Sequence, residues 1–107
     1  MPQIKRREKW IELPEEYEGF EVRVWVNAPA KLWSELQTGN EERARAALSQ
    51  IVLEHNNWLD FDGEPFPAAN EPDFWEAIPT ELAALILVAV QQEIQSLPNS
   101  IAPRRRR

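Results

Sequence analysis

Apolar and polar residues alternate near the start of the chain and recur at helical spacing further on. In residues 20–26 (FEVRVWV) every second residue is apolar, which predicts a half-buried strand. A looser alternation in residues 8–13 ends before Pro14, and Gly19 lies between the two segments. We therefore expect a β-hairpin. Because two strands alone are marginal in water, a helix should cover its apolar face.

Four helices are predicted from apolar residues spaced by three and four and from residues that begin and end helices. They are residues 28–37, 41–54, 73–78 and 80–97. Asn27 and Asn40 are typical N-cap residues, and Asp73 with Glu76 matches a capping box. The last helix is apolar on most of its surface between Leu82 and Val90. Its far side must be covered by the hairpin, by a second copy of the chain or by a partner.

These elements predict an α+β fold, with an N-terminal β-hairpin followed by about four helices in a single domain, residues 8–98. We expect residues 1–7 to be a flexible basic N-terminus and residues 99–107 a disordered arginine-rich tail. The longest apolar run has nine residues, and a membrane span needs about 20. With no cysteines and no recognisable targeting segment, the chain is expected to be soluble and cytoplasmic and to avoid membranes.

Charge is distributed unevenly along the chain. The net charge is −6, but residues 1–9 carry +3 and the four terminal arginines carry +4, so the residues between them carry −13. Such a body repels nucleic acid and anionic membranes, whereas the arginines attract both. The arginines are Arg104, Arg105, Arg106 and Arg107. They form either a solubilising end or a nucleic-acid contact.

Residues 55–67 (HNNWLDFDGEPFP) contain the only histidine and two closely spaced aspartates. If Gly63 is placed at position 6 of a helix–loop–helix calcium loop, Asp60 and Asp62 take ligand positions. Positions 1 and 12 would then be tryptophan and alanine, which provide no side-chain oxygen. The spacing therefore argues against a calcium site.

Other chemistry is also poorly supported in this stretch. His55 has no second histidine or cysteine for a zinc site, and no glycine elbow presents a serine or threonine to it. Residues 60–63 (DFDG) favour a turn, which Trp58, Phe61 and Phe66 could anchor to the core. We therefore expect a non-enzymatic protein with no cofactor and no metal. The rigid loop could still be a recognition surface.

Three segments occur in an order that resembles the small tail assembly chaperones of long-tailed bacteriophages. They are IVLEHNNW, DFDGEPFP and IPTELAALI, and the resemblance covers about residues 45–97. It implies a small acidic viral protein in the host cytoplasm that binds the helical tape-measure protein. Such a chaperone keeps the tape-measure protein soluble until the tail tube polymerises around it.

This resemblance and the five tryptophans predict an apolar surface that binds an apolar helical partner. Its candidate residues are Trp33, Trp58, Phe74, Trp75, Leu82, Ile86 and Val90. The alternative is that the same residues form the domain core, or that the last helix is covered in a homo-oligomer. The alternative function is a virion structural protein or a nucleic-acid-associated adaptor that uses Arg104–Arg107.

Overall fold

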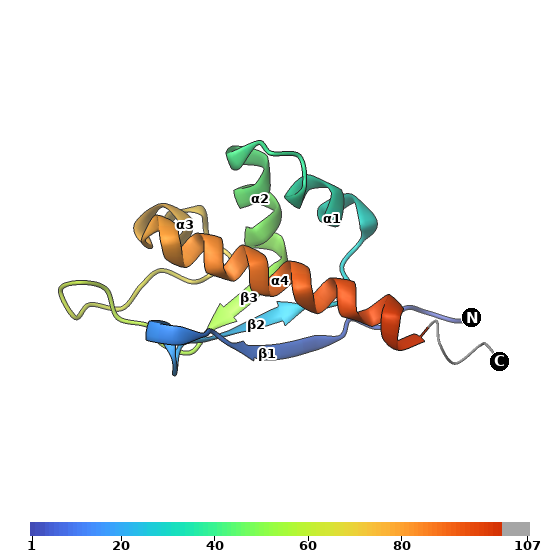
Figure 1. Cartoon of the computed structure of the whole chain (residues 1–107), viewed down its shortest axis with the longest axis horizontal. Coiled ribbons are helices and arrows are strands. Elements are labelled where there is room, and N and C mark those ends of the chain that lie inside the picture. The colour runs from blue at the N-terminus through green and yellow to red at the C-terminus, as the bar shows by residue number, and fades with distance from the viewer. Residues whose placement is uncertain (102–107) are drawn as a thin grey trace.

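The structure is a computed structural model that describes the backbone of residues 1–101 and the side chains of residues 1–94. The described residues form a three-stranded sheet, a short 3-10 helix and four α-helices (Figure 1). In chain order they are β1 (Glu8–Glu12), η1 (Glu15–Tyr17), β2 (Glu21–Trp25), α1 (Ala30–Leu36), α2 (Glu41–Ile51), β3 (Val52–His55), α3 (Pro72–Ala77) and α4 (Thr80–Ile101). The prediction of a single α+β fold with an N-terminal hairpin and four helices is confirmed.

The sheet is antiparallel throughout, with the strand order β1-β2-β3. The predicted hairpin is present, and Glu8 pairs with Trp25 at its open end. The third strand was not predicted, because residues 41–54 were expected to form one helix. The helix ends at Ile51, and β3 continues directly from it to pair with the free edge of β2. That pairing supplies hydrogen-bond partners for the backbone groups at the outer edge of β2, which a longer helix would leave unpaired.

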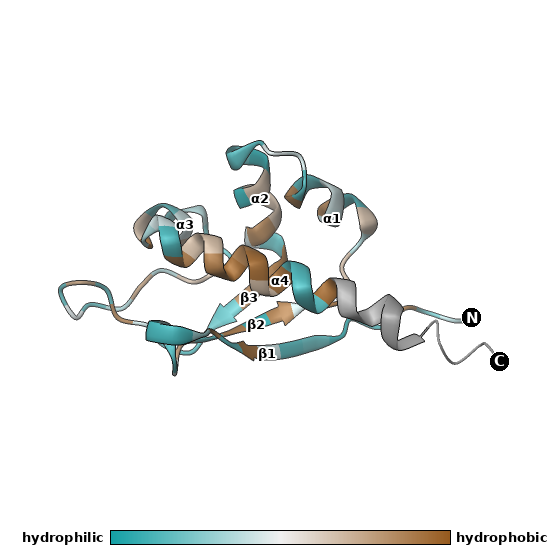
Figure 2. Ribbon diagram, in the orientation of Figure 1, coloured by the Kyte–Doolittle hydropathy of each residue, from teal (hydrophilic) through white to brown (hydrophobic). Residues whose placement is uncertain are grey.

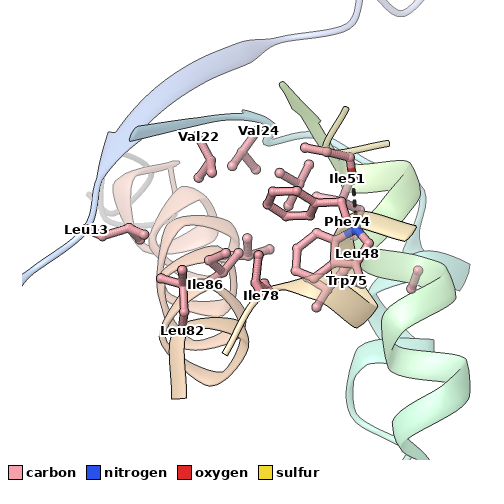
Figure 3. Close-up of a cluster of buried hydrophobic side chains, with 14 of the residues drawn as sticks. Leu13, Val22, Val24, Leu48, Ile51, Phe74, Trp75, Ile78, Leu82 and Ile86 are labelled. Carbon is pink, nitrogen blue, oxygen red and sulfur yellow. Dashed lines mark hydrogen bonds between the residues drawn. The ribbon is translucent and has the colours of Figure 1, made fainter. Parts of the chain in front are cut away.

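The core lies between the sheet, α2, α3 and α4. Val22 and Val24 of β2 point from the sheet towards α4, as Figure 3 shows, and both are completely buried. Leu82, Ile86 and Val90 are spaced by four residues and therefore lie on one side of α4. The sheet thus covers the most apolar side of this helix. Figure 2 shows that the residues of α4 that pass over the sheet are mostly apolar.

The helix ends agree only in part with the sequence. Asn40 caps α2 as expected, with its Oδ1 accepting a hydrogen bond from the Arg43 N–H at 3.0 Å. Asn27 does not cap α1, which begins after Pro29. Its side chain instead accepts from the Arg7 N–H and donates to the Lys5 carbonyl. These bonds hold the N-terminal segment against the end of β2.

The last two helices also differ from the prediction at their ends. Pro72 is the first residue of α3, so Asp73 lies inside the first turn and no side-chain hydrogen bond caps the helix. The capping box with Glu76 is therefore not formed. The α4 helix continues past its expected end at Leu97 to Ile101.

Candidate functional site

His55, the first candidate for chemistry, is part of the fold rather than a free reactive group. Its ring stacks between Trp58 and Phe74, with centroid distances of 5.4 and 5.3 Å. The Trp58 backbone N–H donates to Nδ1 at 3.1 Å, so Nε2 carries the ring proton and faces the Pro67 carbonyl at 3.0 Å. Both ring nitrogens are therefore engaged by the backbone. His55 is the last residue of the strand β3.

Asn56 ties this stretch to the hairpin. Its Oδ1 accepts hydrogen bonds from the Trp58 indole N–H at 2.6 Å and from the Glu21 backbone N–H at 2.8 Å. Its Nδ2 donates to the Gly19 carbonyl at 3.0 Å. One amide thus joins β3, the hairpin turn and a buried tryptophan. We call His55, Asn56 and Trp58 the clasp.

Asp60 organises the loop after the clasp, as turn chemistry predicts. Its Oδ1 accepts from the backbone N–H groups of Asp62 and Glu64, both at 2.9 Å. Gly63 has φ +80° and donates to the Asp60 carbonyl at 3.0 Å. In the part of the chain that the structure describes, no group of three His, Asp or Glu side chains is arranged to hold a metal ion. The loop is therefore built by its own hydrogen bonds, two of which the Asp60 carboxylate accepts.

Six of the seven predicted partner-binding residues lie in the core, so the prediction that they form an exposed surface is wrong for the folded chain. They are Trp58, Phe74, Trp75, Leu82, Ile86 and Val90, each no more than 4% exposed. Figure 3 shows four of them among the clustered side chains, with the Trp75 indole N–H donating to the Ala69 carbonyl at 2.8 Å. A core of this size needs its large apolar side chains inside. Trp33, on α1, is half-buried against that core.

The exposed apolar residues are different ones. Val88 on the outer side of α4 is 46% exposed, and Leu59 and Phe61 in the loop after the clasp are 58% and 85% exposed. Phe61 was expected to anchor the loop to the core, and that expectation is wrong. Arg104–Arg107, the alternative nucleic-acid contact, lie outside the described residues.

A groove lies between α2, α3 and the first turns of α4. It has a volume of about 350 Å³ and is lined mainly by small and apolar side chains of α2, α4 and the segment before α4. They include Ala44, Leu48, Ile78, Ala83, Ala84 and Leu87. A second hollow of about 310 Å³ lies between α2 and α3 and shares Arg45, Trp75 and Glu76 with the first. Spacing alone could have indicated Ala84 and Val88, because they lie opposite the buried side of α4.

Ion pairs hold the polar exterior together. Arg23 on β2 bonds Glu54 on β3 at 2.7 Å and also bonds Glu8 on β1, so it spans all three strands. The hydrogen bond that Arg23 donates to Glu54 is the main reason why the pKa of Arg23 lies above its ordinary value. Arg43 makes two hydrogen bonds to Glu35, which lower the pKa of that carboxyl and join α1 to α2.

No helix in the described part of the chain is both long enough and apolar enough to cross a bilayer. The sequence matches no protein-family model and no curated protein, and the fold matches no solved structure.

Proposed function

We propose that this chain is a non-enzymatic binding protein that holds an apolar helical partner in the groove between α2, α3 and α4. The resemblance to phage tail assembly chaperones suggests that the partner is a tape-measure protein, held in the host cytoplasm during tail assembly. The observation that carries the proposal is the apolar groove beside α4, which adjoins a second hollow.

The groove has the features of a site for an amphipathic helix. Helices that bind in grooves insert apolar side chains spaced by three and four residues. Ala84 leaves room for such a side chain on α4, and Leu87 and Leu48 supply apolar walls. Val88 extends the apolar surface beyond the groove. The partner would therefore be recognised by burial of apolar area more than by specific polar contacts.

The charges around the groove suit a holding role. Glu41 and Glu76 line it together with the single base Arg45, and the rest of the body is strongly acidic. Acidic proteins bound along a long apolar helical partner give the complex a charged exterior. Added acidic residues are especially effective at preventing aggregation. The same charges disfavour nucleic acid as the partner of this surface.

The experiment is co-expression of the chain with a phage tape-measure protein, the partner class that the resemblance implies. With the wild-type chain, we expect the partner to remain soluble and to co-purify at moderate ionic strength. The double variant Ala84→Glu with Val88→Glu places two carboxylates on the apolar side. Burial of unpaired charge is costly, so the amount co-purified should fall about ten-fold or more.

Gln50→Glu is the matched control, because it adds a carboxylate at an exposed position of α2 that does not line the groove. It should co-purify the partner as the wild type does. The proposal is overturned if the double variant folds and still holds the partner, or if the control loses the partner equally.

A further inference from the structure

A second apolar surface lies at the end of the molecule where the hairpin turn meets the loop after the clasp. A hollow of about 160 Å³ there is lined by Tyr17 and Phe20 from the hairpin, by Leu59, Phe61 and Phe66 from the loop, and by residues at the start of α4. We call these five residues the aromatic end. Figure 1 shows that this loop and η1 lie at the end opposite the chain's N-terminus.

Hydrogen bonds within the loop hold this surface in an exposed position. Phe61 is 85% exposed although its neighbours are held tightly. The Asp60 N–H donates to the Glu64 carbonyl at 2.7 Å, and the Phe66 N–H donates to the Trp58 carbonyl at 3.1 Å. A loop fixed in this way presents an aromatic side chain without a large ordering cost on binding.

Acids flank the residues of the aromatic end in the sequence, and no Lys or Arg lies next to them there. Residues 10–22 and 46–92 contain no Lys or Arg. The acids that flank these residues in the sequence are Glu15, Glu16, Glu18, Asp60, Asp62, Glu64 and Glu81. Asp60 lines the hollow itself, and Glu81 accepts a hydrogen bond from the Tyr17 hydroxyl at 3.0 Å. No ion pair forms at any of them within the described residues. The pKa of Tyr17 is raised first by partial burial and by its hydrogen bond to Glu81, and then by the negative charges of Glu81 and Glu16.

This combination fits arginine better than any other side chain. A guanidinium stacks on aromatic rings and pairs with carboxylates at the same time. Among the described residues, the Arg6 guanidinium already stacks on an aromatic ring and lies 4.1 Å from the centroid of the Trp25 ring. The strongest concentration of arginine in the sequence is Arg104–Arg107.

The arginines cannot reach the aromatic end of their own chain. Leu82 lines the hollow, and α4 continues to Ile101, which places its last residue roughly 29 Å away at 1.5 Å per residue. The six residues that follow span at most about 20 Å when fully extended. The arginines of another copy have no such restriction. We therefore propose that the aromatic end of one copy binds Arg104–Arg107 of a second copy, so that the chains associate head to tail.

This inference is independent of the proposed function, because it uses a different surface. A head-to-tail contact leaves a free site at each end of a pair, so association should continue into longer species unless it closes into a ring. It should also weaken steeply with salt, because the contact is largely electrostatic.

The test is sedimentation velocity of the full chain at low and at high ionic strength. The wild type should form concentration-dependent oligomers at low salt and return to monomer at high salt. One variant, Phe61→Ser, removes the exposed ring. A second variant replaces all four arginines by glutamine. Each should weaken association by about ten-fold or more, since stacked cations at exposed and partly desolvated sites contribute on this scale.

A mixture of the two variants tests the head-to-tail arrangement directly. The Phe61→Ser chain keeps its arginines, and the glutamine chain keeps its aromatic end, so the mixture should form a 1:1 dimer that grows no further. Because Phe61 is almost fully exposed, its replacement should leave thermal unfolding unchanged.

Val88→Ser is the control for a contact through α4, and it should associate as the wild type does. Three results would overturn the proposal. They are a wild type that stays monomeric at low salt, a mixture that forms no dimer, and association that is lost in Val88→Ser but kept in Phe61→Ser. If the wild type is monomeric, the aromatic end would have to bind a basic segment of a different protein instead.

Discussion

Replacing Asn56 by alanine tests whether residues 55–58 serve the fold. Asn56 is half-buried, and its Oδ1 is the acceptor for the Trp58 indole N–H and for the Glu21 backbone N–H. In Asn56→Ala both donors lose their partner. The Gly19 carbonyl also loses its donor, but it lies at an exposed turn where water can replace the amide.

The cost follows from the burial of the two donors. Trp58 is only 4% exposed. Loss of the acceptor for its indole N–H should therefore cost the full penalty of an unsatisfied buried group, about 1–3 kcal/mol. The Glu21 N–H is nearer to the surface and should add roughly 1 kcal/mol. We expect Asn56→Ala to lower the free energy of unfolding by about 2–4 kcal/mol. For a chain of this size the melting temperature should then fall by roughly 10 °C or more.

The assay is urea unfolding followed by circular dichroism and tryptophan fluorescence. The neighbouring Asn57 offers a matched control, because it is exposed, makes no side-chain hydrogen bond and has φ +62°. Glycine adopts that conformation readily, so Asn57→Gly should change the free energy of unfolding by less than about 0.5 kcal/mol. A loss below about 0.5 kcal/mol in Asn56→Ala, or an equal loss in the control, would refute the structural role of the clasp.

Three further predictions concern α4, the loop after the clasp and the change of folding stability at acid pH. Ile86→Ala should lower the free energy of unfolding by about 2–5 kcal/mol in urea titrations, whereas Val88→Ala should cost less than about 1 kcal/mol because Val88 is half exposed. Gly63→Ala should cost about 1 kcal/mol from backbone strain alone, since φ is +80° and nothing blocks a methyl group; no loss would show that the loop relaxes. Because Arg43 lowers the pKa of Glu35 from 4.5, that pair should stabilise the fold above this pH and cease to do so as pH falls through the lowered pKa. The stability difference between Glu35→Gln and wild type should therefore shrink in acid, and a constant difference would contradict this.

Local patterns were sufficient for the hairpin, for most helices and for the Asp60 turn. Each depends on neighbours in sequence: the alternation in residues 20–26, the Asn40 cap and the glycine after the aspartates. The third strand could not be found in this way. Val52 fits the buried side of a helix as well as that of a strand, and its place is decided by pairing with Val24 of β2.

The candidate site was harder to predict, for a related reason. The spacing of Leu82, Ile86 and Val90 shows that one side of α4 is apolar, but it cannot show what covers that side. The sheet covers it, so the partner surface has to be sought on the opposite side, at Ala84 and Val88. The roles of His55 and Asn56 were also hidden, because their partners come from the hairpin turn and from α3.

In the proposed function, a partner helix binds the outer side of α4 and does not need the core to open. The chain has no cysteines, so a single cysteine can report on one position at a time. We would measure thiol labelling of Val88→Cys and Phe61→Cys at moderate ionic strength, with and without the co-purified helical partner. The partner should slow labelling at position 88 about ten-fold or more and leave labelling at position 61 unchanged. Equal labelling of position 88 with and without a bound partner would contradict this mode of binding.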